Sequence, residues 1–159
     1  MNYSIFSLSG KDYRNVAPVF LRIGAGIGFI NHGWAKLVRG PEHFASLLEQ
    51  LHIPFSHFMA WTSTLIELLG GFALLIGLFV SLVTLPLLCT MLVAMFSIHI
   101  HYGFSAVKTI GLTPQGPLFG PPGYEINMIY ISCLMALMLL GAGRYSIDAF
   151  RTKRKMPLS

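Results

Sequence analysis

Four long apolar runs, separated by shorter polar stretches, dominate the pattern of the chain. They lie near residues 16–36, 57–80, 82–102 and 125–143. Each run approaches the roughly 20 residues that an α-helix needs to cross the hydrocarbon of a bilayer. The pattern therefore predicts an all-α fold, an integral membrane four-helix bundle that forms a single domain over residues 1–159.

The first polar stretch contains a helical pattern of its own. Phe44, Leu47, Leu48 and Leu51 recur at the spacing of one helix face, and Pro41 precedes them. Proline is common in the first turn of a helix, and this spacing is typical of an amphipathic helix. We expect this helix to lie in the membrane interface and to cover the outer end of the bundle.

The other connections differ in length. The second and third runs are separated by only a few residues around Ser81, which predicts a tight helical hairpin. The stretch between the third and fourth runs is long, and residues 113–123 are rich in proline and glycine. That composition predicts an irregular loop, and its length makes it a candidate lid or partner-binding loop.

The composition agrees with a membrane protein. The chain is 54% hydrophobic and 11% charged, with a mean hydropathy of +0.66, whereas a soluble domain carries about 25% charged residues. The net charge of +5 does not indicate a nucleic-acid-binding protein, because the basic residues crowd the C-terminus beside the last apolar run. These C-terminal basic residues indicate membrane topology and a contact with anionic lipid instead. They are Arg151, Lys153, Arg154 and Lys155.

Lysine and arginine are more frequent in the two tails than in the loops at 37–56 and 103–124. The positive-inside rule therefore predicts that both termini are cytoplasmic and that the two longer loops face outward. Lys11, Asp12 and Arg14 precede the first run, and no clear cleavage site follows it, so we expect this run to remain as a membrane anchor. The predicted location is the bacterial inner membrane, with several membrane crossings.

Glu67 lies inside the second apolar run, and no other charged residue occurs between Glu49 and Lys108. A carboxyl group inside a membrane costs several kcal/mol unless it is paired or protonated, so such residues usually have a function. Small and polar residues recur around it at three- and four-residue steps, which predicts that it faces the bundle interior. They are Ala60, Ser63, Thr64, Gly70 and Gly71. A buried structural carboxyl and a group that handles protons or ligand remain open alternatives.

Arg22 is a second charge within a predicted span. Its guanidinium could extend to cytoplasmic phosphates, or it could form an ion pair with Glu67. At the rise of an α-helix the two residues differ in depth by about 10 Å, which a long arginine side chain could largely close.

A denser set of polar residues lies at the outer ends of the predicted spans. It comprises Asn31, His32, Lys36, His99, His101, Tyr102, Tyr124, Glu125 and Asn127. On straight helices His32 and His99 come to nearly equal depth, slightly outward of Glu67. This predicts an outer pocket for a ligand headgroup or a proton relay, with headgroup anchoring as the alternative. No metal site is predicted, because His99 and His101 point about 200° apart on a helix.

The chain lacks a nucleophile–base pair, a Walker motif and a haem-attachment motif, so whether it is an enzyme stays open. Gly24, Gly26 and Gly28 do not form a nucleotide loop, because no strand precedes them and the run is membrane-like. The spacing of Gly24 and Gly28 predicts a helix-packing face instead.

Taken in order, several short motifs resemble the DoxX family of small four-helix membrane proteins. They are Arg22-Ile23-Gly24, Asn31-His32-Gly33-x-x-Lys36-Leu37, Phe44…Leu47…Ile53-Pro54, Glu67-x-x-Gly70-Gly71-x-x-Leu74-x-x-Gly77-Leu78, Tyr124-Glu125-x-Asn127 and Gly141-x-Gly143-Arg144-Tyr145-Ser146-Ile147-Asp148. The resemblance covers roughly residues 16–150. It implies that the family-like polar positions are Arg22, His32, Lys36, Glu67, Glu125, Asn127 and Asp148.

The family is named for a small subunit linked to a thiosulfate:quinone oxidoreductase. Other members are associated with membrane oxidoreductase complexes and redox stress, and some with gene clusters for copper-binding modified peptides. The resemblance thus implies a redox-associated membrane subunit with a quinone as a candidate cofactor. The expected partners are the lipid bilayer, a membrane or periplasmic redox subunit and further copies in an oligomer, but no nucleic acid.

Two other classes of function stay open. The chain could be a small transporter or exporter component, including one for a metal-binding peptide system, with Arg22 and Glu67 lining the path. It could also be an assembly scaffold without chemistry. For the leading hypothesis, the residues expected to bind ligand or relay protons are Glu67, His32, His99, Arg22, Lys36, Glu125 and Asn127.

Overall fold

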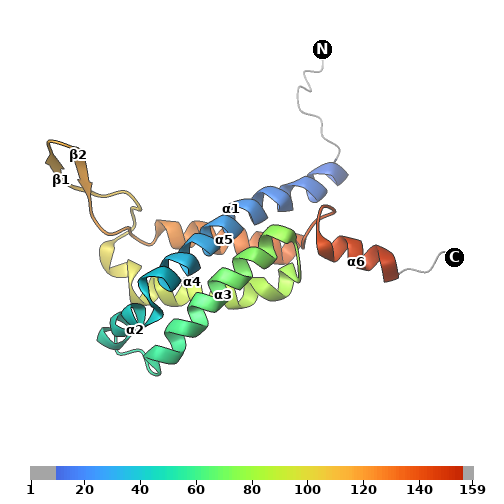
Figure 1. Ribbon diagram of the computed structural model, residues 1–159. Coiled ribbons are helices and arrows are strands. Elements are labelled where there is room, and N and C mark those ends of the chain that lie inside the picture. The colour runs from blue at the N-terminus through green and yellow to red at the C-terminus, as the bar shows by residue number, and fades with distance from the viewer. Residues whose placement is uncertain (1–9, 156–159) are drawn as a thin grey trace, which may run out of the picture.

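The computed structural model describes residues 10–155 of the chain, which form a mainly helical fold (Figure 1). In chain order the elements are α1 (Gly10–Arg39), α2 (Pro41–Gln50), α3 (Ser56–Ile76), α4 (Val80–Ser97), the 3-10 helix η1 (His99–Tyr102), β1 (Thr109–Thr113), β2 (Gly116–Phe119), α5 (Glu125–Leu140) and α6 (Ile147–Lys155). The expectation of a mainly helical protein is confirmed.

The long helices α1, α3, α4 and α5 enclose one apolar core. Helix α1 packs against α3 and α5, and α4 packs against α3 and α5. The largest fully buried side chains of this core come from all of them: Phe29, Leu74, Leu87, Leu134 and Leu137. Polar side chains that project inward from these helices are therefore removed from solvent.

Two of the described helices, α3 and α4, are long and apolar enough to cross a membrane, judged by length and composition. Helix α5 is apolar but shorter, with 16 residues. Large apolar side chains also remain exposed on the outer faces of these helices, for example Leu69, Leu82 and Leu139 at 63%, 65% and 82%. Soluble monomers rarely expose such extended apolar surface. The membrane crossings of α1 and α5 stay a prediction.

The helices have two different ends (Figure 1). The start of α1, the turn between α3 and α4, and α6 share one end, while α2, η1 and the β-hairpin lie at the other. At the first end, the Asp148 carboxylate accepts hydrogen bonds from the backbone N–H groups of Phe79 and Val80, at 2.9 and 3.0 Å. The first N–H groups of a helix need such acceptors, so a distant segment caps α4.

The helix ends differ from the predicted spans. Helix α3 ends at Ile76 rather than near residue 80, because Gly77 adopts a left-handed conformation (φ 70°) that terminates the helix. Helix α5 likewise ends at Leu140, before Gly141 (φ 73°). The third run does not form one helix to residue 102, since α4 ends at Ser97 and η1 follows.

The first loop contains the predicted helix, α2, over Pro41–Gln50. Ala45 and Leu48 are buried against Ala60 of α3, whereas Leu47 on the predicted face is 39% exposed. His57 contacts Glu42 and Glu49 through its two ring nitrogens, which ties α2 to the start of α3. The helix itself is confirmed, and its place in the membrane interface stays a prediction.

The prediction of an irregular loop over 113–123 is wrong for its first half. Strands β1 and β2 form an antiparallel hairpin that projects from the helices (Figure 1), with Leu112 opposite Pro117 and Thr113 opposite Gly116. Both strands are edge strands, where proline is tolerated because no ladder hydrogen bond is lost on the open side. Apolar and threonine residues on either side of the turn outweighed its proline and glycine content.

Glycines allow α1 and α3 to approach closely, but they are not the predicted pair. Gly24 is exposed, and an added Cβ there would meet nothing within 4 Å. Gly26 faces α3 instead, where its Cβ would lie 2.9 Å from the Gly71 carbonyl oxygen, while Gly28 faces Tyr130 of α5. The predicted face is thus right for Gly28, which packs on α5, and wrong for Gly24, since Gly26 contacts α3 on the same side of α1 as Arg22.

Replacing Gly71 by alanine is expected to destabilise the protein by about 1–3 kcal/mol, the usual range for overpacking. The new Cβ would lie 2.8 Å from the backbone oxygen of Gly26 and the backbone nitrogen of Ile30, neither of which can move alone. Loss of helical circular dichroism during SDS titration in detergent micelles measures this. Gly24→Ala is the matched control and should be neutral or stabilising by up to about 1 kcal/mol. Equal effects of the two substitutions would contradict the packing.

Candidate functional site

Glu67 forms an ion pair with Lys36 inside the helices. The Lys36 Nζ lies 2.7 and 2.8 Å from the two carboxylate oxygens, so the ammonium donates to both. The Glu67 side chain is 4% exposed and that of Lys36 is 21% exposed. The amine also lies 4.4 Å from the centre of the Phe44 ring on α2. The pair therefore joins α1 to α3, next to α2.

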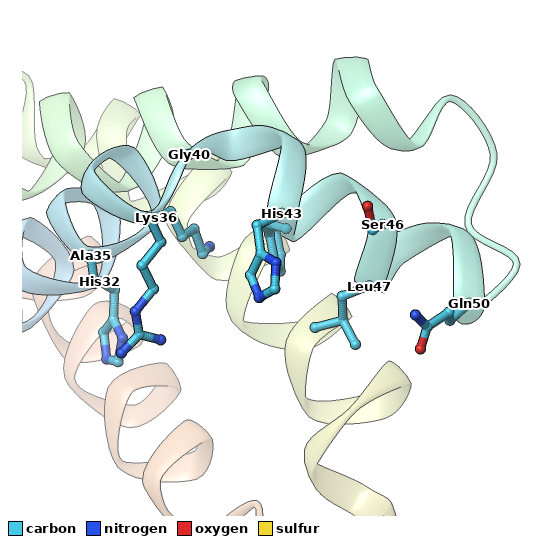
Figure 2. A pocket seen from close by; sticks show the side chains of 10 residues that line it. His32, Ala35, Lys36, Gly40, His43, Ser46, Leu47 and Gln50 are labelled. Atoms are coloured by element: carbon cyan, nitrogen blue, oxygen red, sulfur yellow. The ribbon is translucent and has the colours of Figure 1, made fainter.

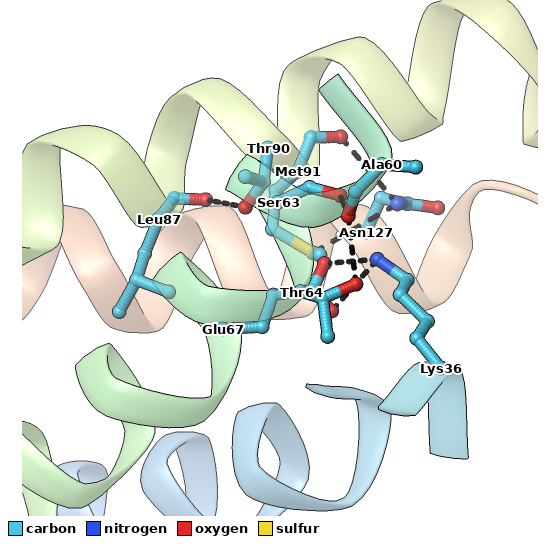
Figure 3. A network of polar contacts seen from close by, with 9 residues as sticks. All are labelled: Lys36, Ala60, Ser63, Thr64, Glu67, Leu87, Thr90, Met91 and Asn127. Atoms are coloured by element: carbon cyan, nitrogen blue, oxygen red, sulfur yellow. Dashed lines mark hydrogen bonds and ion pairs between the residues drawn. The ribbon is translucent and has the colours of Figure 1, made fainter. Parts of the chain in front are cut away.

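The sequence predicted the environment of Glu67 correctly. Ala60, Thr64, Gly70 and Gly71 are all buried, so the small and polar stripe of α3 faces the interior. The hydroxyl of Thr64 donates to the carbonyl of Ala60 at 2.7 Å (Figure 3). The Thr64 hydroxyl is thereby satisfied within its own helix, and Lys36 is the partner that neutralises the carboxylate.

Asn127 of α5 lies in the same region (Figure 3). Its side chain is 2% exposed, and its amide nitrogen lies 3.5 Å from the carbonyl oxygen of Met91 and 3.9 Å from the Met91 sulfur. The amide oxygen has no hydrogen-bond partner among the described residues. A buried acceptor without a partner is unfavourable. Packing of the core therefore does not explain why residue 127 is an asparagine.

His32 lies beside the ion pair on α1. Glu67, Lys36 and His99 are the titratable groups close enough to influence its charge, and its ring contacts Tyr130 edge-on at 6.0 Å. His99 is held by η1, where its Nδ1 lies 2.9 Å from the carbonyl oxygen of Pro122. The structure therefore brings His32, His99, Lys36 and Glu67 into one neighbourhood.

A cavity of about 510 Å³ opens between the end of α1 and α2 (Figure 2). Its titratable side chains are basic and include His32 and Lys36 from α1 and His43 from α2, which Figure 2 labels. The remaining lining residues are Ala35, Arg39, Gly40, Phe44, Ser46, Leu47 and Gln50. The cavity thus combines several hydrogen-bond donors with apolar surface, and Lys36 connects it to Glu67.

Arg39 and His43 were not singled out from the sequence. Neither side chain makes a hydrogen bond or an ion pair with the described residues, although both line the cavity. Gly40 lies between them in the chain with φ 87°, so α1 ends and α2 begins within one residue. The Gly-Pro dipeptide after Arg39 was the available signal, since it predicts a sharp turn that places the two side chains across a concave corner.

Arg22 does not pair with Glu67. Its guanidinium donates to the carbonyl oxygens of Leu74 and Leu75 at 2.9 and 3.0 Å, near the end of α3. It also donates to those of Ala142 and Tyr145 at 2.6 and 2.9 Å. Arg22 and Glu67 thus bind separate partners. The structure shows no contact between the two side chains that would support a shared transport path.

Glu125 and Asp148 have structural partners as well. The Glu125 carboxylate accepts a hydrogen bond from the Ala106 backbone N–H at 2.8 Å, which holds the segment before the β-hairpin against α5. Asp148 caps α4 as described above. Among the residues the structure describes, no group of three or more His, Cys, Asp or Glu side chains is placed to hold a metal ion.

Comparison with known proteins places these features in a family. The family model for DoxX matches residues 17–100, more than half of the chain, and that range includes Arg22, His32, Lys36 and Glu67. The chain belongs to the DoxX family. The DoxX match includes α2 and all of the cavity lining but ends before the β-hairpin and α5.

This DoxX chain is also similar to an uncharacterized protein of Haemophilus influenzae. The two are 27% identical over 142 residues, which cover 87% of this chain and 85% of the relative. No solved structure matches the chain. Family membership and the apolar helices together support a membrane protein, and the chemistry of the site has to be argued from its residues.

Proposed function

We propose that this protein is a multi-pass inner-membrane subunit of a redox-associated complex that binds a quinone-type headgroup in the cavity between α1 and α2. The observation that supports it is the combination of donors and apolar surface next to a buried ion pair. A quinone ring presents carbonyl oxygens that accept hydrogen bonds, and the cavity offers donors from His32, Arg39 and His43. Phe44 and Leu47 supply surface for the ring and its tail.

The size of the cavity suits such a ligand. At about 510 Å³ it falls within the roughly 300–1,000 Å³ that is usual for small-molecule sites. Leu47 of the cavity lining is 39% exposed, and Trp34 of α1 is 57% exposed. Apolar surface therefore lies near the mouth of the cavity. A ligand with an isoprenoid-like tail could reach the cavity from the bilayer without crossing water.

The Lys36–Glu67 pair would handle protons for the bound ligand. Reduction of a quinone to a quinol takes up two electrons and two protons, and the chain has no metal or redox cofactor motif that would supply electrons. The electrons would come from a redox partner subunit. Lys36 lines the cavity and is held in place by Glu67, so its ammonium can donate one proton to the reduced ligand and take up another from solvent at the mouth of the cavity, and a second such transfer completes the quinol.

The predicted topology places this cavity on the outer side, with α2 in the interface and both termini in the cytoplasm. The β-hairpin projects from the same end and would meet a membrane or periplasmic partner subunit. An oligomer remains part of the proposal, because the exposed apolar faces of α3 and α4 permit contacts between copies as well as with lipid.

The test is binding of a decyl-substituted benzoquinone to the purified protein in lipid nanodiscs, measured by calorimetry. The variants Arg39→Met and His43→Leu each remove the side-chain N–H donors without creating a buried charge, and each is expected to weaken binding about 5- to 10-fold. His101→Leu is the matched control, because His101 is exposed on η1 and lies outside the cavity lining. Absence of binding by the unaltered protein, or equal weakening in all three variants, would overturn the proposal.

A scaffold without chemistry is the second candidate, and one observation favours it. Arg22, Glu67, Glu125 and Asp148 all engage groups of the chain itself, as a purely structural set of charges would. The discriminating measurement is activity of the assembled complex with the Arg39→Met and His43→Leu variants at limiting quinone. A scaffold predicts full activity in both variants, whereas a quinone site predicts activity lowered about 5- to 10-fold, in step with the weaker binding, without loss of assembly.

A further inference from the structure

A second groove lies at the other end of the helices, between the start of α4 and α6. It has a volume of about 370 Å³ and is lined by Phe79, Ser81, Leu82, Asp148, Arg151 and Thr152. None of these residues lines the cavity between α1 and α2 or has a role in the proposed function. The groove brings together the α3–α4 turn and the C-terminal segment, which are far apart in the chain.

The groove contains one acid, Asp148, and one base, Arg151, and the two have different partners. Both carboxylate oxygens of Asp148 accept N–H groups at the start of α4, so this acid is already engaged. The Arg151 guanidinium lies 4.6 Å from the centre of the Phe79 ring, a cation–π contact that holds its position. Among the described residues Arg151 has no carboxylate partner. An oriented arginine without a counterion is suited to bind a phosphate group.

The groove is polar at one side and apolar at the other. Ser81 and Thr152 place hydroxyl groups beside Arg151, and the Thr152 hydroxyl already donates to the Asp148 carbonyl at 2.9 Å. Leu82 is 65% exposed and begins the outward apolar face of α4, which continues with Leu85 at 50%. A free inorganic anion would use only the polar side. A phospholipid would use both, with its phosphate at Arg151 and its acyl chains along Leu82 and Leu85.

Helix α6 and the turn before it match the surface of an anionic membrane. Tyr145 and Phe150 are exposed at 62% and 68%, and the segment 144–155 carries five basic residues against the single acid Asp148. Exposed aromatic residues next to basic ones are typical of segments that lie in the interface of a membrane with anionic lipids. The positive-inside rule, applied to the same residues, predicts that this end faces the cytoplasm.

We propose that this groove is a binding site for an anionic glycerophospholipid of the cytoplasmic leaflet, with Arg151 binding the phosphate and Leu82 the first part of an acyl chain. The lipid would connect α6 to the α3–α4 turn at the surface of the protein, in addition to the hydrogen bonds by which Asp148 already connects them. The groove shares no lining residue with the cavity between α1 and α2, so the lipid site can be tested separately from the proposed quinone site.

The test counts lipids that remain bound to the protein by native mass spectrometry after transfer from micelles containing equal amounts of phosphatidylglycerol and phosphatidylcholine. The unaltered protein is expected to retain phosphatidylglycerol preferentially, and Arg151→Gln to lower that preference roughly fivefold. Arg144→Gln is the matched control, because Arg144 is exposed in the same segment but does not line the groove. It should leave the preference nearly unchanged.

A second variant separates a defined groove from diffuse attraction. Ser81→Phe fills the groove while every charge stays, so it is expected to lower retention as much as Arg151→Gln. Unchanged retention in Ser81→Phe, or equal losses in Arg151→Gln and Arg144→Gln, would overturn the proposal. Displacement of the bound lipid by millimolar inorganic phosphate would overturn it as well, since the site would then recognise the free anion. Circular dichroism of each variant, and its binding of the decyl-substituted benzoquinone, should match the unaltered protein.

Discussion

Replacing Lys36 by methionine is expected to destabilise the protein by about 3–5 kcal/mol, the usual result of leaving one member of a buried ion pair alone. The Glu67 carboxylate is only 4% exposed and both of its oxygens are bonded to the Lys36 amine. Methionine keeps much of the side-chain volume, so the loss reports charge and hydrogen bonding rather than a cavity. The free energy of unfolding, from SDS titration in detergent micelles, measures it.

The double variant Lys36→Met with Glu67→Leu gives the decisive comparison. It removes both charges, so most of the lost stability should return, because an apolar pair of similar volume is often as stable as a buried ion pair. Lys108→Met is the matched control, since Lys108 is exposed in the segment leading to the β-hairpin and should change stability by less than about 0.5 kcal/mol. A double variant no more stable than Lys36→Met alone would contradict the ion pair as the source of the effect.

Replacing Arg22 by methionine is expected to cost at least about 3 kcal/mol, because each hydrogen bond to a charged group contributes about 1.5–3 kcal/mol. The guanidinium serves four carbonyl oxygens, two near the end of α3 and two in the segment after α5. Without it the buried Leu74 carbonyl and three partly buried carbonyls lose a partner. SDS titration gives the total effect on stability.

Hydrogen exchange measured by mass spectrometry should locate that effect. In Arg22→Met, faster exchange is expected over residues 74–80 and 142–150, since Arg22 joins these segments, but not in α2. Arg22→Lys should recover only part of the stability, because an ammonium group cannot reach four carbonyls in a planar arrangement. Arg144→Gln controls for loss of a basic residue in the same region. Uniform acceleration along the whole chain would show that Arg22 supports the fold in general and not this junction.

The sequence was most informative where a pattern repeats along one helix. The three- and four-residue steps around Glu67 predicted its burial, because the helical period alone decides which residues share a face. The same reasoning found α2 from the spacing of its apolar residues. It was right for Gly28 but chose Gly24 instead of Gly26, because spacing identifies a stripe of glycines but not which of them meets a neighbouring helix.

Partners of charged groups could not be predicted in the same way. Depth along straight helices suggested Arg22 or the outer histidines as partners of Glu67. His32 does lie beside Glu67, but the ion pair forms with Lys36. Side-chain length explains the difference, since lysine and arginine can reach several ångströms along or across a helix. Arg39 and His43 were missed for a related reason: their shared cavity depends on the angle between α1 and α2 at Gly40.

The sequence by itself therefore determined the helical character of this DoxX protein, the place of its apolar helices along the chain and the inward direction of Glu67, because these follow from composition and the period of the helix. Only the tertiary structure decided that Lys36 neutralises Glu67, that Arg22 joins α3 to the segment after α5, and that Asp148 caps α4 from 68 residues away. Each of these contacts joins residues distant in the chain. They depend on how the helices pack and cross, and no local pattern contains that information.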